Sequence, residues 1–356
     1  MMKKHPLIVI CGPTATGKTD IGIRLSREIN GNIISADSRQ LYRYMDIGTG
    51  KDIKENSKFQ IPNSKGQASN IQYQTSNLKP QYIQIGYYTI EGINVWLYDI
   101  IEPDKRFSAH EFSEAGWETI NHLVNCSITP IIVGGSGLYI KALVDGFDTS
   151  SAPDWDMRKV YNNMTVHELQ TTLTSLNPRR LYAMNNSDRH NPRRLIRSIE
   201  QSTSQAQITD HELLSFLPVC RQAGEGRESR TREANDIIFI GLTAPLDVLY
   251  ARIEKRVDNR IEQGIIHEIQ SLLKRGYVWS DPGLDTVGYK EWRPFIEGRS
   301  TQAECISLWK LHERQYARRQ LTWFLKDKRI TWFDITKCSP DGIVDAIKTM
   351  YNDFMC

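Results

Sequence analysis

Short apolar runs alternate along this chain with stretches in which apolar residues recur every three or four positions. The runs predict buried strands at residues 7–11, 32–35, 95–100, 130–133 and 237–242. The recurring stretches between them predict helices at residues 18–29, 108–125 and 137–144. Strands that alternate with helices predict an α/β fold, a mostly parallel sheet with helices on both faces. In such a sheet, ligands bind at the carboxyl ends of the strands.

The alternation is first interrupted at residues 53–84. This segment is rich in Asn, Gln, Ser and Lys and shows little periodicity, so it is predicted as a long polar surface loop. The pattern at residues 87–98 is typical of a hairpin that leads back into the sheet. Residues 1–146 are therefore predicted as the first part of an α/β core.

A second interruption covers residues 147–233, where strand patterns vanish and helical patterns dominate. Because a strand pattern resumes afterwards, this segment is predicted as a helical lobe inserted into the core. Its end, at residues 221–232, is charged and contains glycine, which is typical of a linker. Residues 234–356 are predicted to return to the core sheet and to add helices at 245–275 and 301–327.

Bulk composition fits a globular protein of the cytosol. The 356 residues include 40% hydrophobic and 24% charged residues, and no apolar stretch approaches the ~20 residues of a membrane span. The N-terminus leads directly into a strand pattern without the features of a signal peptide. The six cysteines form no C-x-x-C pair, which disfavours a zinc site and a disulfide framework. We therefore expect a cytoplasmic protein that makes no membrane contact.

A phosphate-binding loop follows the first predicted strand. It has the form G-x-x-x-x-G-K-[ST] and consists of Gly12, Pro13, Thr14, Ala15, Thr16, Gly17, Lys18 and Thr19. Glycines let backbone N–H groups surround an anion, and the helix N-terminus adds partial positive charge. Lys18 can neutralise phosphate, and the Thr19 hydroxyl is suited to Mg²⁺. Strand, loop and helix together predict a P-loop NTPase-like fold that binds a di- or triphosphate, with an ATP site as an open alternative.

Two further turns at predicted strand ends carry polar side chains. Asp37 follows the second strand, where a carboxylate can accept a proton from a nucleophile or hold a metal-bound water. Asp37 or Ser38 can equally cap a short helix at residues 40–44. Ser136 lies in a Gly-rich turn after the fourth strand, and its hydroxyl can donate to an anion. Because the glycines permit close backbone approach, this turn is a candidate second wall of the same site.

Arg252 and Arg256 are spaced i, i+4 in a predicted helix and therefore share a face. Two guanidinium groups on one face are suited to a diphosphate, which each can bind in a bidentate manner. The neighbouring carboxylates Glu254, Asp258 and Glu262 offer ordinary salt bridges as an alternative, and both interpretations stay open.

Basic residues crowd two segments although the net charge is only +3. The first segment contains Arg179, Arg180, Arg189, Arg193, Arg194 and Arg197. In the helix predicted at 301–327, a basic residue recurs every four positions and an aromatic one every seven: Lys310, Arg314 and Arg318, and Trp309, Tyr316 and Trp323. Such a combination is suited to an RNA backbone with unstacked bases. The alternative is a solvated basic face with the aromatic rings in the core.

Seven motifs occur in a fixed order along the chain: GPTATGKT, ISADSRQLYRYMDIGTGKD, PDKRFSAHEF, VGGSGLYIKAL, RIEKRV, DTVGYKEW and YARRQLTWF. In this order they resemble the bacterial tRNA dimethylallyltransferases, the tRNA isopentenyltransferase family, over residues 7–333. The resemblance implies transfer of a dimethylallyl group from its diphosphate to the exocyclic amine of the adenosine 3′ to the tRNA anticodon.

The resemblance also implies roles for the candidate residues. The matching Asp37 would accept the amine proton, and Ser136 stands where many family members have Thr. The phosphate loop and Mg²⁺ on Thr19 would hold the diphosphate. Arg256 matches the family's diphosphate ligand better than Arg252 does.

Contacts to the anticodon arm of tRNA are implied as well, and we expect the enzyme to be a monomer. The matching positions are Asp37, Ser38, Arg39, Gln40, Arg158, Arg193, Arg194, Arg197, Gly288, Tyr289, Lys290, Arg318, Arg319, Gln320, Thr322 and Trp323. The inserted lobe would clasp the anticodon arm, and the target base would leave its stack to reach the site.

Other functions for the phosphate loop are a prenyltransferase acting on free adenine nucleotides and a small-molecule kinase using ATP. The basic segments disfavour the kinase, which has no use for them. An RNA-binding module with a vestigial loop is a third possibility, disfavoured by the intact Lys18, Thr19 and Asp37.

Overall fold

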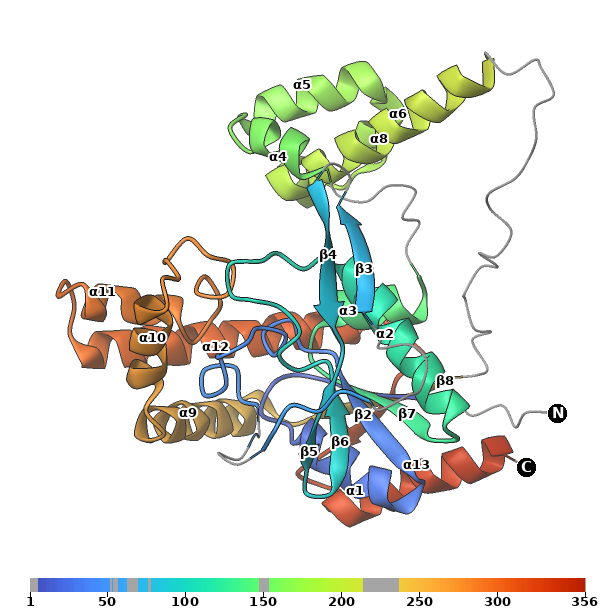
Figure 1. Cartoon of the computed structure of the whole chain (residues 1–356), viewed down its shortest axis with the longest axis vertical. Helices are drawn as coiled ribbons and strands as arrows, with labels where there is room; N and C mark the ends of the chain where they lie inside the picture. Colours follow the sequence, from blue (N-terminus) through green and yellow to red (C-terminus); the bar gives the residue numbers. More distant parts are fainter. Residues whose placement is uncertain are drawn as a thin grey trace. The chain divides into compact units, whose positions relative to one another are not determined.

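Seven strands form one sheet in the order β5-β6-β2-β7-β1-β8-β9 (Figure 1). The computed structural model describes residues 6–51, 53, 57–62, 70–75, 78–146, 154–213 and 237–355, with the backbone alone at 70–75, 78–82, 155 and 204–213. The strands are β1 (Leu7–Cys11), β2 (Gly31–Ser35), β5 (Tyr87–Ile90), β6 (Ile93–Trp96), β7 (Thr129–Val133), β8 (Ile237–Thr243) and β9 (Thr331–Asp334). Neighbouring strands pair in parallel except in the β5–β6 hairpin. This sheet confirms the predicted fold class.

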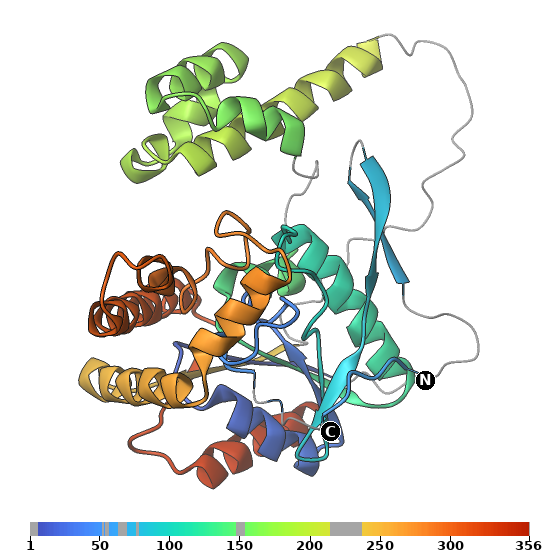
Figure 2. The same cartoon turned by 60° about the vertical axis from the view of Figure 1, so that its left-hand side comes forward.

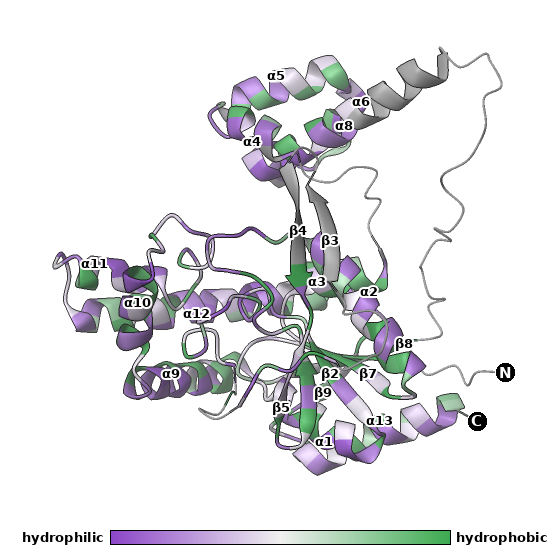
Figure 3. Ribbon diagram, viewed as in Figure 1, coloured by the Kyte–Doolittle hydropathy of each residue, from purple (hydrophilic) through white to green (hydrophobic). Residues whose placement is uncertain are grey.

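Helices cover both faces of the sheet. They are α1 (Lys18–Glu28), α2 (Ala109–Asn125), α3 (Gly137–Val144), α9 (Leu246–Glu262), α10 (Ile265–Lys274), α11 (Arg293–Ile296), α12 (Gln302–Phe324) and α13 (Pro340–Met355), with a 3-10 turn at Lys290–Trp292. Successive side chains of a strand point to opposite faces. Val9 of β1 therefore packs in one hydrophobic cluster with α2, α3 and α12, and Ile10 packs in a second cluster with α1 and α13. Figure 2 shows α1 and α13 side by side on one face, and Figure 3 shows the hydrophobic central strands.

A separate helical unit follows the first part of the sheet. The chain divides into two compact units, one of Met1–Tyr73, Tyr82–Asp145 and Thr231–Cys356 and one of Gln74–Gln81 and Gly146–Arg230. The helices of the second unit are α4 (Trp155–Tyr161), α5 (Val166–Leu176), α6 (Pro178–Ala183), α7 (Asn186–Arg189) and α8 (Pro192–Leu213). Leu169 and Leu173 of α5 pack against Leu195 and Ile199 of α8 in a core of their own. The predicted lobe ends at 147 and 233, and the linker at 221–232, lie outside the described residues.

The prediction of one polar loop at 53–84 is wrong for its second half. Residues Asn70–Thr75 form β3 and Leu78–Gln84 form β4, which pair in a sheet of two strands. Two neighbouring segments can pair their backbone N–H and C=O groups whatever their side chains are. Such a pair of strands therefore needs no apolar periodicity. Composition alone therefore missed these strands.

Two helix predictions also need correction. The single helix expected at 245–275 is two helices, α9 and α10, because Gly264 between them has φ +93° and ends the first helix in a left-handed conformation. Residues 40–44 form turns in place of the expected short helix. Strand β9 and helix α13 were not predicted; β9 has only four residues and lies at the edge of the sheet.

Replacement of Gly264 tests this helix break. Gly264→Ala should lower the free energy of unfolding by about 1–2 kcal/mol, because a Cβ in the left-handed region crowds the following carbonyl. Gly264→Asn should lower it less, since Asn tolerates this conformation better. Urea unfolding of the three proteins measures the difference. Equal stability of the wild type and Gly264→Ala would contradict the assignment of the break to backbone conformation.

Candidate active site

The phosphate loop connects β1 to α1 in a conformation that requires glycine. Gly12 has φ +133° and Gly17 has φ +82°. A Cβ on Gly12 would lie 2.2 Å from the carbonyl oxygen of Leu242 in β8, so a larger residue would push the neighbouring strand away. Gly17 is the N-cap of α1 and offers no side-chain cap. The first N–H groups of α1 are therefore free of a side-chain cap and can bind an anion.

Lys18 lies in this loop with a weakened proton affinity. Its Nζ donates a hydrogen bond to the carbonyl oxygen of Pro13 at 2.7 Å. Burial lowers the pKa of Lys18 to about 8; the nearby Asp37 opposes this effect, and Arg256 adds to it. A bound anion would restore the charge of Lys18, because an opposite charge favours the protonated form.

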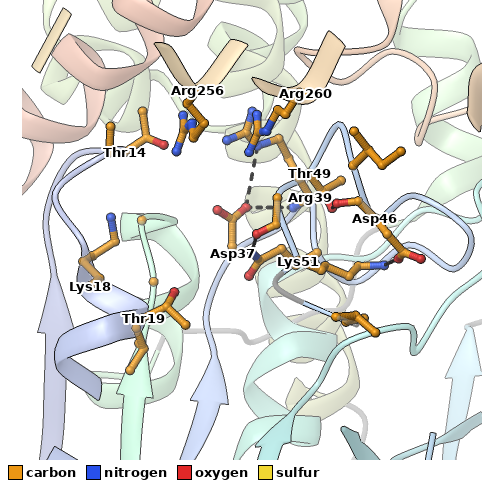
Figure 4. A pocket seen from close by; sticks show the side chains of 18 of the residues that line it. Thr14, Lys18, Thr19, Asp37, Arg39, Asp46, Thr49, Lys51, Arg256 and Arg260 are labelled. Carbon is orange, nitrogen blue, oxygen red and sulfur yellow. Dashed lines mark hydrogen bonds and ion pairs between the residues drawn. The ribbon is translucent and has the colours of Figure 1, made fainter. Parts of the chain in front are cut away.

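The strand ends surround one cavity of about 1360 Å³ (Figure 4). Among its lining residues are ten of the predicted site residues: Thr14, Ala15, Gly17, Lys18, Thr19, Asp37, Arg39, Gln40, Arg252 and Arg256. These residues follow β1 and β2 or lie on α9, which follows β8. The sequence-predicted chemistry therefore gathers at one edge of the sheet, as parallel α/β topology requires. Gly134 and Gly135, after β7, line the cavity too, so the predicted second wall is present.

Asp37 occupies a tight turn directly after β2. Its Oδ1 accepts a hydrogen bond from the backbone N–H of Arg39 at 3.0 Å, and its side chain is 16% exposed. Ser136 Oγ accepts a second bond from the N–H of Ser38 at 2.8 Å. A Cβ on Gly134 would lie 2.2 Å from the carbonyl oxygen of Ala36, so the two turns touch through their backbones. Asp37 thus caps a turn and not a helix, and the Ser136 hydroxyl holds this turn in place.

Four arginine side chains line the same cavity as Asp37 and the phosphate loop. Arg252 is exposed at the cavity, whereas Arg256 and Arg260 reach the buried carboxylate of Glu313 at 3.2 and 3.5 Å. Arg39 Nη1 donates to the same carboxylate at 2.9 Å. The ion pair that Arg256 makes with Glu313 reaches α12, beyond the neighbouring carboxylates considered from the sequence.

Glu313 is fully buried and ionised. Burial alone would raise its pKa, but Arg39, Arg256 and Arg260 reverse the effect and lower it to about 2. The same carboxylate, together with Asp37, raises the pKa of Arg39 against the effect of burial. Glu313 therefore stays charged at any physiological pH.

Glu268 of α10 supports the far wall of the cavity. Its carboxylate accepts hydrogen bonds from the N–H groups of Asp46, Ile47 and Gly48 at 2.8, 2.8 and 3.2 Å, and from the hydroxyl of Tyr289 at 2.6 Å. Burial raises the pKa of Glu268. This one side chain fixes the loop that carries Asp46 into the cavity.

Arg260, Glu268 and Glu313 were not predicted as site residues, although the sequence pattern around the two carboxylates indicated that they are buried. Glu268 falls three residues after the buried Ile265, and Glu313 falls four after the buried Trp309. Both therefore occupy the core faces of their helices, where an unpaired carboxylate would be costly. A charged residue in an apolar helical stripe was the available sign.

The predicted RNA-contact residues of the core unit divide into exposed and buried groups. Arg318, Arg319, Thr322 and Trp323 of α12 are exposed, as is Lys290. Two basic residues nearer the start of α12 form ion pairs with α9: Lys310 pairs with Asp258, and Arg314 pairs with Glu254.

Four residues of that prediction are buried: Arg39, Gly288, Tyr289 and Gln320. The amide of Gln320 accepts from the N–H of Thr14 at 2.8 Å and donates to the carbonyl oxygen of Gly135 at 2.9 Å. Tyr289 is 0% exposed and bound to Glu268. Gln320 and Tyr289 therefore support the walls of the cavity through protein partners. An RNA contact by any of the four residues stays a prediction.

In the helical unit, Arg193 and Arg194 of α8 are exposed, and Arg194 pairs with Asp188. Arg158 instead makes a bidentate salt bridge to the buried Glu200 at 2.6 and 2.9 Å. Arg197 reaches the same carboxylate at 3.1 Å. Arg158 therefore joins α4 to α8, and Arg197 pairs with Glu200 within α8. Contacts of either residue with RNA stay a prediction.

Few protein ligands are available for a metal ion. Within the residues that the structure describes, no three His, Cys, Asp or Glu side chains gather as a metal-binding group. Thr19, Asp20 and Asp37 line the cavity. No described helix is long and apolar enough to cross a membrane.

Fold and site together define a P-loop α/β protein built to hold a phosphate-bearing ligand beside a carboxylate. Family models for IPP transferase and isopentenyl transferase match residues 87–327 and 5–60. The chain is 34% identical to the tRNA dimethylallyltransferase of Alkaliphilus oremlandii, over 99% of this chain and 98% of that one. The chain therefore belongs to the IPP transferase family of tRNA-modifying prenyltransferases.

Solved structures agree with this assignment. The full-length tRNA isopentenylpyrophosphate transferase of Bacillus halodurans has a TM-score of 0.63 and 30% identity, and the match covers 99% of this chain and 97% of that one. A eukaryotic dimethylallyltransferase acting on tRNA has a TM-score of 0.71 at 20% identity, with 98% and 79% covered, and shows that the fold is shared.

The lowered pKa of Lys18 predicts how diphosphate binding depends on pH. Above pH 8 the lysine of the empty site is neutral, so binding must take up a proton. The last proton of an organic diphosphate leaves near pH ~6. Its affinity should therefore be constant between about pH 7 and 8 and fall about tenfold per pH unit above that. Titration calorimetry at several pH values measures this. In Lys18→Arg the decline should vanish up to pH ~9.5; a decline of equal size there would exclude Lys18 as its source.

Proposed function

We propose that this protein transfers a dimethylallyl group from dimethylallyl diphosphate to the exocyclic amine of the adenosine 3′ to the tRNA anticodon. The observation that carries the proposal is the shared cavity, in which the phosphate loop, Asp37 and the arginines of α9 face one another. A kinase would place a phosphoryl group between such elements; the family assignment and the exposed basic side chains favour a prenyl group and an RNA acceptor.

The reaction breaks the bond between C1 of the prenyl group and the diphosphate oxygen. Negative charge develops on the leaving diphosphate, and Lys18, Arg252 and Arg256 are placed to stabilise it. The amine nitrogen forms the new bond to C1 and gives one proton to the Asp37 carboxylate. Oδ1 of Asp37 is engaged by the N–H of Arg39, which leaves Oδ2 for this proton. The Ser136 hydroxyl keeps the turn that presents Asp37 in place.

Mg²⁺ fits this site as the partner of the diphosphate. Thr19 offers a hydroxyl at the cavity, and Mg²⁺ is commonly held by a few protein oxygens together with phosphate oxygens and water. When bound, the ion would neutralise charge on the leaving group. A monomeric enzyme that acts in the cytoplasm on tRNA completes the proposal.

The acceptor distinguishes this proposal from its two alternatives. Purified protein is incubated with dimethylallyl diphosphate and Mg²⁺ and, separately, unmodified tRNA, AMP or ATP, and prenylated adenosine is detected by mass spectrometry. We expect one modified adenosine per tRNA. Transfer to AMP alone would assign the enzyme to free nucleotides, and ATP hydrolysis without any transfer would favour a kinase.

Asp37→Asn tests the proton acceptor. The amide retains an oxygen for the N–H of Arg39 but cannot take the amine proton, so kcat should fall about 10²–10⁴-fold. Binding of tRNA and of dimethylallyl diphosphate should change little. Single-turnover rates and separate binding titrations measure the two quantities. An unchanged single-turnover rate would remove Asp37 from this role.

The exposed arginines predict the salt dependence of tRNA binding. Arg193→Ala and Arg318→Ala should each weaken binding and reduce the slope of log affinity against log salt by about 0.7–0.9, the effect of one lost phosphate contact. Lys348→Ala is the matched control, because Lys348 pairs with Glu28 on the α1 and α13 face. A salt dependence equal to that of the wild type in the two arginine variants would mean that these side chains make no contact with the tRNA phosphates.

A further inference from the structure

One buried carboxylate contacts arginines from two parts of the site, the turn after β2 that carries Asp37 and the helix α9. Glu313 of α12 is 0% exposed and meets guanidinium groups from two other parts of the chain. Its Oε1 accepts from Arg39 at 2.9 Å and lies 3.5 Å from Arg260, and its Oε2 accepts from Arg256 at 3.2 Å. Figure 4 shows Arg256 and Arg260 at the same side of the cavity, close to Arg39 and Asp37.

Within this cluster, Arg39 contacts the proposed proton acceptor, Asp37. Arg39 follows Asp37 in the turn after β2, and its backbone N–H binds Asp37 Oδ1 while its Nε lies 3.8 Å from the same oxygen. The guanidinium group lies over the ring of Tyr316, with its carbon 4.7 Å from the ring centre. Arg39 is thus clamped by α12 from two sides, which fixes the turn that presents Asp37.

The Arg256 side leads to the leaving group. Arg256 lines the cavity and also binds Glu313, so this side chain connects the buried carboxylate with the wall of the cavity. Arg260 lies behind it, and Gly50 is required there, since a Cβ on Gly50 would lie 2.1 Å from Arg260 Nη2. Three guanidinium groups against one carboxylate leave an excess of positive charge next to the phosphate loop.

We propose that Glu313 is a positioning residue both for the proton acceptor and for the arginine that receives the leaving diphosphate. Through Arg39 it orients Asp37, and through Arg256 it holds the arginine that receives the leaving diphosphate while offsetting part of its charge. Glu313 does not touch substrate, because it is fully buried and does not line the cavity. The proposal rests on the prenyl-transfer function proposed above, in its assignment of Asp37 and Arg256.

The alternative is a purely structural role, in which Glu313 only fastens α12 to α9. That role predicts loss of folded protein without a change in the properties of the folded fraction. The positioning role predicts opposite changes in two measurable quantities. Loss of the carboxylate charge frees Arg256 for an anion and makes the cluster more positive, so diphosphate binds more tightly, whereas the loosened Asp37 turn slows the chemistry.

Glu313→Gln is the test variant, because the amide keeps the shape and one acceptor oxygen. In the full-length protein we expect the dissociation constant for inorganic diphosphate at pH 7.5 to fall about 3–10-fold, the effect of one charge at several ångströms in a partly screened site. The single-turnover rate with saturating tRNA and dimethylallyl diphosphate should fall at least about tenfold. A weaker or unchanged diphosphate affinity, or an unchanged rate, would overturn the proposal.

Arg39→Met separates the two sides and covers the case in which Glu313→Gln does not fold. It should slow single-turnover transfer at least about tenfold without tightening diphosphate binding, since it removes a positive charge. An unchanged rate would overturn the link from α12 to Asp37. Thermal unfolding corrects each value for the folded fraction. Because diphosphate affinity is measured without tRNA, the absence of any transfer by the wild type would count against the proposed function and leave the binding test of Glu313 intact.

Discussion

Two buried polar side chains of α12 hold together the loops that follow four separate strands. Gln320 joins the phosphate loop after β1 to the glycine turn after β7, through Thr14 and Gly135. Glu313 joins the Asp37 turn after β2 to helix α9 after β8, through Arg39 and the α9 arginines. A parallel sheet brings strand ends to one edge but does not fix their loops. These side chains supply that constraint, and the cavity has its shape because α12 is packed there.

The same constraint concentrates positive charge. Lys18, Arg256 and Arg260 lie partly or fully out of water, where like charges are costly unless an anion accompanies them. Burial lowers the pKa of Lys18 to about 8, which is one sign of this cost. Glu313 offsets part of the charge, and a bound diphosphate would offset the rest. The site is therefore complementary to an anionic leaving group before any substrate arrives.

The sequence was sufficient for the central strands of the sheet, the phosphate loop and the positions of Asp37 and Arg256, because each leaves a local pattern. The sequence was insufficient where the role of a residue depends on partners that are distant along the chain. Glu313 acts on residues far away in the chain, and nothing local reveals its partners. Gln320 and Tyr289 belong to motifs of the RNA-modifying family, and nothing local showed that they are buried and hydrogen-bonded to other parts of the site. The strands β3 and β4 lacked apolar periodicity, so composition gave no sign of them.

The central claim is that the phosphate loop holds a leaving group, so that carbon and not phosphorus is transferred. Dimethylallyl diphosphate labelled with ¹⁴C in the prenyl group and ³²P in the β-phosphate tests this claim in one reaction with unmodified tRNA and Mg²⁺. The account predicts that ¹⁴C enters a tRNA adenosine in equal amount to the ³²P released as intact diphosphate. Appearance of ³²P on the acceptor, or release of single phosphate without ¹⁴C in tRNA, would contradict it.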